Sequence, residues 1–169
     1  TIRNLAVDLS GATDGIGISA IGRGHLVENC RVTGTGTTND PNYIGIELRG
    51  QSIVARNNYV RGILDYGNAD DKAGYGIFMA GDSISLEHNE IHDCKHTIST
   101  SERRAKSTRL RMSNNLCRQR GDWEGLTDSI GDFLFMGNLD VHANVKNALI
   151  QGNYCESWGR WNAAIRNGD

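Results

Sequence analysis

One short segment of the sequence, residues 92–96, gathers acid, base and thiol side chains in the order His92-Asp93-Cys94-Lys95-His96. A histidine titrates near neutral pH and can give or take a proton, and Asp or Lys side chains do so in suitable surroundings. We therefore take His92, Asp93 and Lys95 as candidates for proton transfer. The two histidines do not indicate a zinc site, because their spacing is diagnostic only on a helix.

Carboxylates in the neighbouring stretches point to one specific chemistry. Two carboxylates about 5–5.5 Å or about 6.5–9.5 Å apart suit hydrolysis of a glycosidic bond with retention or inversion. The candidate pairs are Asp70 or Asp71 opposite Asp93 or Glu124. Carboxylate and carbonyl oxygens around Asp70 and Asp71 would also suit Ca²⁺, although the sequence has no regularly spaced calcium loop. We expect no cofactor, with calcium as the alternative.

A second chemistry uses cations in place of the paired carboxylates. Lys95 or His92 would abstract the proton next to a uronate carboxylate, and Arg118 or Arg120 would neutralise that carboxylate. The residues alone do not decide between hydrolysis and this elimination.

Three tryptophans form a separate group of candidates. Trp123 follows Cys117 by six residues and Trp161 follows Cys155 by six residues, with Trp158 between the latter two. An aromatic face can stack on a sugar ring. The alternative is a hydrophobic patch that closes loops or meets a neighbouring chain. The predicted substrate-binding residues are Arg118, Arg120, Trp123, Trp158 and Trp161.

A repeat runs through the whole chain and predicts the elements that carry these residues. Several segments follow the pattern apolar-x-apolar-x-x-Asn-x-apolar, for example Ile84 to Ile91. Between them lies a weaker motif, as in Gly15-Ile16-Gly17-Ile18 and Gly45-Ile46-Glu47-Leu48, for which we place the last copy at Asp132-Phe133-Leu134-Phe135. The aligned columns read Val7, Val32, Val60, Ile91, Cys117, Cys155 and, five places upstream, Ile2, Val27, Ala55, Leu86, Met112, Ile150.

The repeat indicates a stack of short parallel strands. Its spacings of 25, 28, 31, 26 and 38 residues centre near 30, and period-two alternation is typical of strands. Asn58, Asn89, Asn115 and Asn153 occupy one column, where side-chain amides can bond from coil to coil and tolerate left-handed turn geometry. We predict an all-β parallel β-helix of about six coils, with both apolar columns inside and no large helices.

Loop lengths predict where a ligand would bind. The connections after Val60 and after Cys117 are long, whereas His92 to His96 form a short one. Because insertions gather on one side of a solenoid, the short connection becomes a floor between two walls. Such a polar cleft suits an oligosaccharide, and ordinary solvated loops are the alternative.

Composition limits the function classes. The 169 residues carry 18 basic and 20 acidic side chains, a net charge of −2, so we expect no nucleic-acid partner. No apolar stretch approaches the roughly 20 residues of a membrane span, so we expect no membrane insertion. We interpret residues 1–169 as a single β-helix domain, a fragment of a longer chain. Cys117 and Cys155 are expected to be buried thiols, although strand spacing permits a bridge.

Uneven coils, an inward aliphatic column and an Asn ladder together resemble the right-handed parallel β-helix of the pectate-lyase-like superfamily. That superfamily includes polysaccharide lyases, epimerases, hydrolases and bacteriophage tailspikes. The resemblance implies a polysaccharide partner, an extracellular or virion location and a homotrimer. We expect a carbohydrate-binding, carbohydrate-cleaving module of the tailspike type that acts on bacterial surface polysaccharide. The alternatives are a stand-alone lyase or epimerase acting on uronans, and a non-catalytic adhesin.

Overall fold

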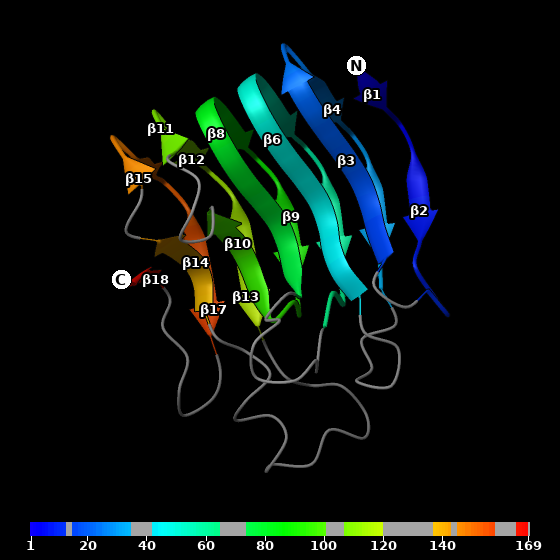
Figure 1. Cartoon of the computed structure of the whole chain (residues 1–169). Helices are drawn as coiled ribbons and strands as arrows, with labels where there is room; N and C mark the ends of the chain where they lie inside the picture. Colours follow the sequence, from blue (N-terminus) through cyan, green and yellow to red (C-terminus); the bar gives the residue numbers. More distant parts are fainter. Residues whose placement is uncertain are drawn as a thin grey trace.

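The protein is built from parallel strands that coil around one core (Figure 1). The computed structural model describes residues 1–12, 15–34, 42–64, 74–100, 107–119, 137–142, 145–157 and 165–168. Within these residues every regular element is a strand, and every strand pairing is parallel. The predicted all-β parallel solenoid is therefore confirmed.

Three faces surround the core, and the first two share one 12-stranded sheet. The first face contains β3 (Gly15–Arg23), the first part of β6 (Asn42–Arg56) and of β8 (Tyr75–Glu87), then β10 (His96–Thr100), β14 (Gly137–His142) and β18 (Ile165–Gly168). The second face contains β1 (Ile2–Arg3), β4 (Leu26–Glu28), the later parts of β6 and β8, β12 (Arg111–Ser113) and β16 (Leu149–Gln151). Two short strands, β11 (Ser107–Thr108) and β15 (Val145–Lys146), pair at the corner between these faces.

The third face is a separate six-stranded sheet. It contains β2 (Ala6–Asp8), β5 (Arg31–Thr33), β7 (Tyr59–Arg61), β9 (Glu90–His92), β13 (Leu116–Gln119) and β17 (Tyr154–Ser157). The chain thus passes from the first face to the second, to the third, and on to the next level of the first.

The number of complete turns differs from the prediction. The sequence predicts about six coils, whereas about three turns are complete. The chain runs without a gap across all three faces at residues 15–33, 42–61 and 75–92. The third face still stacks six strands, but the remaining levels are described with gaps or for only some faces.

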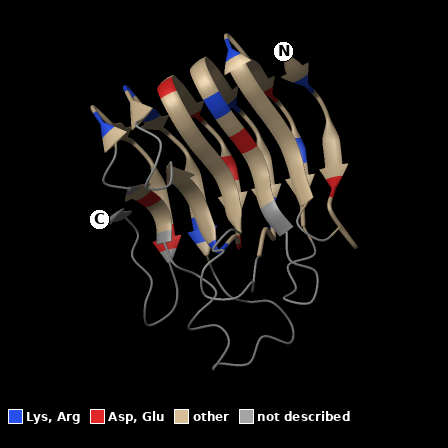
Figure 2. Ribbon diagram, in the orientation of Figure 1, with Lys and Arg blue, Asp and Glu red and all other residues tan. Residues whose placement is uncertain are grey.

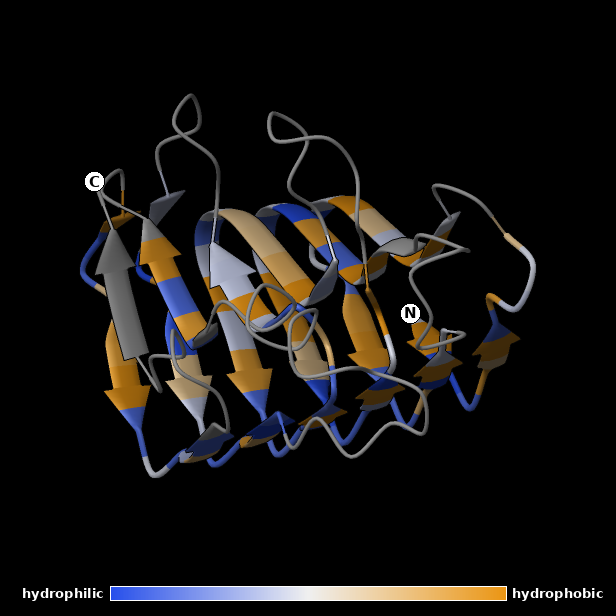
Figure 3. Cartoon of the chain, turned by 90° about the horizontal axis from the view of Figure 1, so that it is seen from below, coloured by the Kyte–Doolittle hydropathy of each residue, from blue (hydrophilic) through white to orange (hydrophobic). Residues whose placement is uncertain are grey.

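Both predicted apolar columns lie inside the solenoid, in the predicted register. On the third face each residue is the Cα partner of the next, from Val7 through Ile91 to Cys155, and the second-face column from Ile2 to Ile150 behaves alike. The middle members of both columns are fully buried, and the end members are partly buried. Hydrophobic bands therefore continue from strand to strand (Figure 3).

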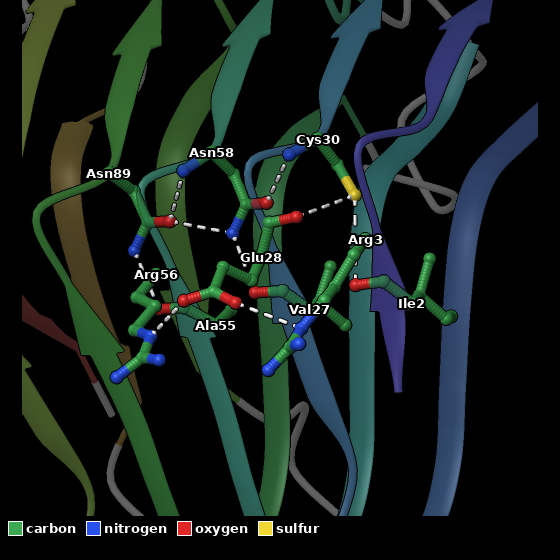
Figure 4. Close-up of polar contacts among 9 residues, drawn as sticks. All are labelled: Ile2, Arg3, Val27, Glu28, Cys30, Ala55, Arg56, Asn58 and Asn89. Carbon is green, nitrogen blue, oxygen red and sulfur yellow. Dashed lines mark hydrogen bonds and ion pairs between the residues drawn. The ribbon is translucent and has the colours of Figure 1, made fainter.

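The Asn ladder is confirmed beside the third face (Figure 4). The side-chain amide of each Asn donates to Oδ1 of the next: Asn58 to Asn89 at 2.9 Å, Asn89 to Asn115 at 3.0 Å and Asn115 to Asn153 at 2.9 Å. Three members are buried and Asn153 is half-buried. At the other end the backbone N–H of Cys30 donates to Oδ1 of Asn58, so the ladder continues on a residue without an amide side chain.

The residue before each ladder Asn adopts the left-handed backbone conformation. The sequence interpretation assigns that conformation to the ladder Asn itself and is wrong on this point. Asn57, His88 and Asn114 have φ of 55°, 54° and 54°. The ladder residue that follows is then free to turn its amide along the stack. Asn57 and Asn114 suit the position before the ladder residue because Asn tolerates positive φ.

Glycines let β6 and β8 pass from the first face to the second without a break. Gly22, Gly50 and Gly81 are Cα partners with φ of 121°, 135° and 144°. A Cβ on Gly50 would lie 1.9 Å from the carbonyl oxygen of Gly22, and one on Gly81 would lie 2.0 Å from that of Gly50. Only glycine fits this column at the spacing of the sheet.

The first and the last copy of the weaker motif are both displaced from their predicted register. Ile46 pairs with Ile18 instead of Ile16, so the first copy begins at Gly17. Leu139 pairs with Ile98, so the last copy lies at Asn138-Leu139-Asp140-Val141, after the residues 132–135 that the repeat predicts.

Candidate functional site

The outer side of the first face holds a second buried cluster, separate from the core. Ile44, Tyr75, Phe78 and Ala80 form it, whereas the neighbouring Ile46, Ile77 and Met79 belong to the core. Phe78 and Ala80 alternate with Ile77 and Met79, as the strand period of two requires. Ile44 and Tyr75 lie two residues before Ile46 and Ile77 and break this alternation, because Gly45 and Gly76 between them also face the core. We call the outward side chains of this sheet the His96 face, defined by Ile44, Glu47, Arg49, Tyr75, Phe78, His96, Ser99 and Asp140.

His96 and Asp140 form a buried pair on this face. Nδ1 of His96 lies 3.1 Å from Oδ2 of Asp140, and the two side chains are 5% and 2% exposed. Asp140 pairs with Ser99 in the sheet, and Ser99 follows His96 by three residues along β10. The contact is an ion-pair distance without hydrogen-bond geometry at Nδ1, so it places a carboxylate beside the imidazole, and Nε2 is the other ring nitrogen.

Aromatic rings border the pair on one side. The ring of Tyr75 lies 5.2 Å from that of His96 and 5.4 Å from that of Phe78, centroid to centroid. Tyr75 is the sheet partner of His96, so this arrangement is fixed by strand register. The buried phenol and imidazole together offer apolar faces with polar tips.

On β6, the strand next to β8, the His96 face continues with the buried carboxylate of Glu47 and the half-exposed guanidinium of Arg49. Glu47 is 5% exposed and accepts hydrogen bonds from Ser19 Oγ at 2.6 Å and from Arg49 Nε at 2.5 Å. The guanidinium carbon of Arg49 lies 4.7 Å from the ring centroid of Phe78. Charge, aromatic ring, imidazole and carboxylate thus follow one another across four strands.

One candidate from the 92–96 segment, His92, lies elsewhere, beside the predicted substrate-binding residue Arg118. His92 lies on the outer side of the third face, where Nε2 is 2.6 Å from Oε1 of Glu90 and the ring is 5.6 Å from that of Tyr59. Arg118 is its sheet partner and lies 3.3 Å from Glu156. The structure brings His92 and Arg118 together, but it places His92 and His96 on different faces.

Asp93 and Lys95 occupy the turn that joins these two faces. Asp93 has a φ of 49° and lies 3.5 Å from the Arg61 guanidinium, and its N–H donates to the carbonyl of Arg118. Lys95 is 6% exposed and precedes His96 directly. Lys95 is therefore the candidate of this turn that lies next to the His96 face along the chain.

Cys94, the middle residue of the segment, points into the core. Its side chain is fully buried, and burial raises the pKa of the thiol to about 12. A neutral thiol at this position packs as a small apolar group and gives the segment no nucleophile.

Several predicted site residues lie outside the described residues. These are Asp70, Asp71, Arg120, Trp123, Glu124, Trp158 and Trp161. The strands around them do show where those connections begin and end: β7, β9 and β13 end at the edge from which β8, β10 and β14 start. The connections after Val60, after Ile91 and after Cys117 thus leave and rejoin the solenoid at one edge.

The sequence analysis missed His96 and Asp140 as a pair. Asp140 was hidden because the last copy of the weaker motif was aligned six residues too early. In the correct register Asp140 shares a column with Glu47, Phe78 and Ser99. Ser19, the partner of Glu47, belongs to the same column, and a polar residue in four of these five copies is the signal that could have indicated a site.

No metal site stands out in the part of the chain that the structure describes. There, no three His, Cys, Asp or Glu side chains gather in a way that would hold an ion. Charges of both signs are interspersed over the described strands (Figure 2).

Fold and site together define a parallel β-solenoid that carries a histidine–carboxylate pair and aromatic rings on one outer face. Compared with known proteins, the chain matches no family model, no curated protein and no solved structure. Among the described residues, no helix has the length and apolar character to cross a bilayer.

Proposed function

We propose that this protein is a carbohydrate-binding β-helix module that cleaves polysaccharide on its His96 face. The observation that carries the proposal is the buried His96–Asp140 pair, 3.1 Å apart, beside the rings of Tyr75 and Phe78. Charged side chains are rarely buried unless paired, and a buried ionisable pair outside the apolar core is a candidate for a chemical role.

Proton transfer is the chemistry that this pair supports. Asp140 places a carboxylate 3.1 Å from the imidazole, and in the proposed reaction Nε2 of His96 exchanges a proton with a sugar hydroxyl, a glycosidic oxygen or the carbon next to a uronate carboxylate. Arg49, half-exposed over Phe78, supplies a positive charge for an acidic sugar. Lys95, at the adjoining turn, is a second proton carrier.

The geometry of the sheet favours an extended polymer as the ligand. Successive levels repeat every ~4.8 Å, which is close to the advance per residue of an extended glycan chain. Arg49, Phe78, Ser99 and Asp140 lie on four successive levels. Of these four side chains Arg49 is the exposed one, and Phe78, Ser99 and Asp140 are buried, so a polysaccharide lying across the strands would contact Arg49 first and reach the others only if the face opens.

The substrate class that we propose is a bacterial surface polysaccharide, with the chain acting as a tailspike-type module of a homotrimer at an extracellular or virion location. The support is the combination of an uneven parallel solenoid with an Asn ladder, which resembles the pectate-lyase-like superfamily. A lyase or epimerase acting on uronans is the second candidate, favoured by Arg49 and Lys95 beside His96.

Depolymerisation assays on a panel of neutral glycans, uronans and bacterial capsules test the proposal. We expect turnover of at least one polymer by the wild type, and at least a 100-fold loss in His96→Gln and Asp140→Asn at retained fold and retained binding. New ends that absorb in the ultraviolet would identify elimination, and new reducing ends without them would identify hydrolysis.

Matched variants separate this face from the alternatives. His25→Gln changes a partly buried histidine away from this face, which bonds the Ile21 carbonyl at 2.9 Å, and should leave turnover unchanged. Loss of turnover in His92→Gln with full activity in His96→Gln would move the site to the third face. Binding without turnover in every variant would leave a non-catalytic adhesin and contradict the proposed cleavage.

A further inference from the structure

Cys117 and Cys155 are in-register partners on adjacent levels. They pair as Cα neighbours of β13 and β17 and both belong to the inward column of the third face. Cys117 is fully buried and Cys155 is partly buried. Both are free thiols, and each is a hydrogen-bond partner of the other.

We propose that Cys117 and Cys155 are an oxidisable pair that forms a disulfide between the two strands when a glutathione-type disulfide is supplied. Neighbouring parallel strands lie ~4.8 Å apart, and disulfides span Cα separations of about 4.4–6.8 Å. The Cα spacing therefore allows a bridge, and because side chains that point the same way keep their Cβ atoms about 4.8 Å apart, the strands must approach by a few tenths of an ångström to reach the roughly 3.5–4.5 Å of a disulfide. This inference is independent of the proposed function.

The two thiols have different environments, which sets the order of the reaction. The hydrogen bond from Cys117 lowers the pKa of the Cys155 thiol. The same hydrogen bond, together with burial, raises the pKa of Cys117. Because the thiolate is the nucleophile, Cys155 reacts first and Cys117 second.

The steps balance as ordinary thiol–disulfide exchange. The Cys155 thiolate attacks one sulfur of oxidised glutathione, forms a mixed disulfide and releases one glutathione thiolate. Cys117 then gives up its proton and attacks the Cys155 sulfur, and the second glutathione leaves as a thiolate. Two protein thiols are oxidised while one glutathione disulfide is reduced to two thiols.

The other cysteines do not share these features. Cys94 is fully buried, its pKa is raised to about 12, and its Sγ donates to the carbonyl of His92 at 3.3 Å. Cys30 stands one level beyond Asn58 at the end of the ladder, where its N–H donates to Asn58. It directly precedes β5, and two strands lie between β5 and β13. Oxidation should therefore be selective for one pair.

The bridge would enclose the chain between residues 117 and 155, a segment that includes Asp140. A cross-link that closes a loop of this size removes conformational freedom from the unfolded chain. We expect the oxidised protein to melt several degrees higher than the reduced protein and to return to the lower value after reduction with dithiothreitol.

Incubation of the native protein with oxidised glutathione, followed by alkylation, intact-mass measurement and peptide mapping, tests the inference. The expected product lacks two hydrogens, takes up two alkyl groups instead of four and yields one cross-linked peptide pair that joins residues 117 and 155. Cys117→Ser should stop at a stable mixed disulfide on Cys155. Cys155→Ser should not react.

Two controls make the result decisive. Cys30→Ser should cross-link like the wild type, and protein unfolded in urea should give mixed pairings. Four alkyl groups on the oxidant-treated native protein, a lasting mixed disulfide in the wild type, or a bridge that includes Cys94 would each overturn the proposal.

Discussion

Asn58 and Asn89 stand on adjacent levels of the solenoid, and one oxygen joins them twice. Oδ1 of Asn89 accepts the side-chain amide of Asn58 at 2.9 Å and the backbone N–H of Asn58 at 3.1 Å. The Asn89 amide in turn donates to the carbonyl of Ala55 at 2.9 Å. Each ladder residue thus satisfies backbone groups that the turn would otherwise bury without partners.

Removing an inner member of this ladder should be costly. Asn89→Ala removes the partner of the buried Asn58 N–H and one hydrogen bond each from the Asn58 amide, the Ala55 carbonyl and Oδ1 of Asn115, and a buried group left unsatisfied costs about 1–3 kcal/mol. We expect urea unfolding to show a loss of about 3 kcal/mol. Asn153→Ala, at the half-buried end, should cost less, and equal losses at both positions would contradict the ladder as a stabilising element.

A buried leucine tests the second-face column. Leu86 is fully buried between Ala55 and Met112, so Leu86→Ala should lower the free energy of unfolding by about 2–5 kcal/mol. Ser85→Ala, on the opposite side of the same strand, is the matched control and should change it by less than about 1 kcal/mol. A melt that Leu86→Ala leaves unchanged would remove the inward assignment.

The glycine corner predicts a position-specific effect of one methyl group. Gly50→Ala combines a φ of 135° with a contact of 1.9 Å to a carbonyl oxygen and should destabilise by about 3 kcal/mol or more. Gly24→Ala has a φ of 70° and no atom near the added Cβ, so its cost should be about 1–2 kcal/mol. Comparable urea midpoints for the two variants would argue against a tightly packed corner.

An ion pair beside the same corner predicts a dependence of stability on pH. Hydrogen bonds from Arg109 and Thr108 lower the pKa of Asp82 to about 2. Because the folded-state pKa lies below the unfolded value, the contribution is complete above about pH 4 and is lost as pH falls towards 2. The wild type should therefore melt at a higher temperature than Asp82→Asn at pH 5, and this difference should shrink as the pH is lowered to 2. A constant difference over that range would show that the carboxylate contributes no such linkage.

Much of the fold could be predicted because stacking forces equivalent residues into columns. Val60, Ile91 and Cys117 are chemically different, yet each must fill the same place in the core, so alignment on them recovered the register. The ladder asparagines could be predicted as well, because few other side chains can replace a buried amide and Asn therefore recurs at one position of the repeat. The corner glycines could not be predicted, because nothing in the sequence distinguishes them from the other glycines. Their role becomes evident only from the close approach of Gly22 to Gly50 in the structure.

The candidate site was harder to predict because it depends on which face a residue occupies. His92 and His96 are close in sequence, but the turn at Asp93 carries the chain from the third face to the first. Asp140 comes after a long connection of variable length, and repeat spacing gives no fixed position beyond such a connection. The register pairs His96 with Gly137 and Asp140 with Ser99, so only the side-chain contact of 3.1 Å shows that His96 and Asp140 meet.

The most direct test of the His96 face is to follow individual histidine rings while a ligand binds. Protein labelled with ¹⁵N-histidine would be titrated with an oligosaccharide made from a polymer that it binds, and ring signals would be recorded by NMR and assigned with the His96→Gln and His92→Gln variants. We predict that the His96 signals shift in a saturable manner while those of His92 and His25 stay in place. Saturable shifts of His92 with an unchanged His96 would contradict the account.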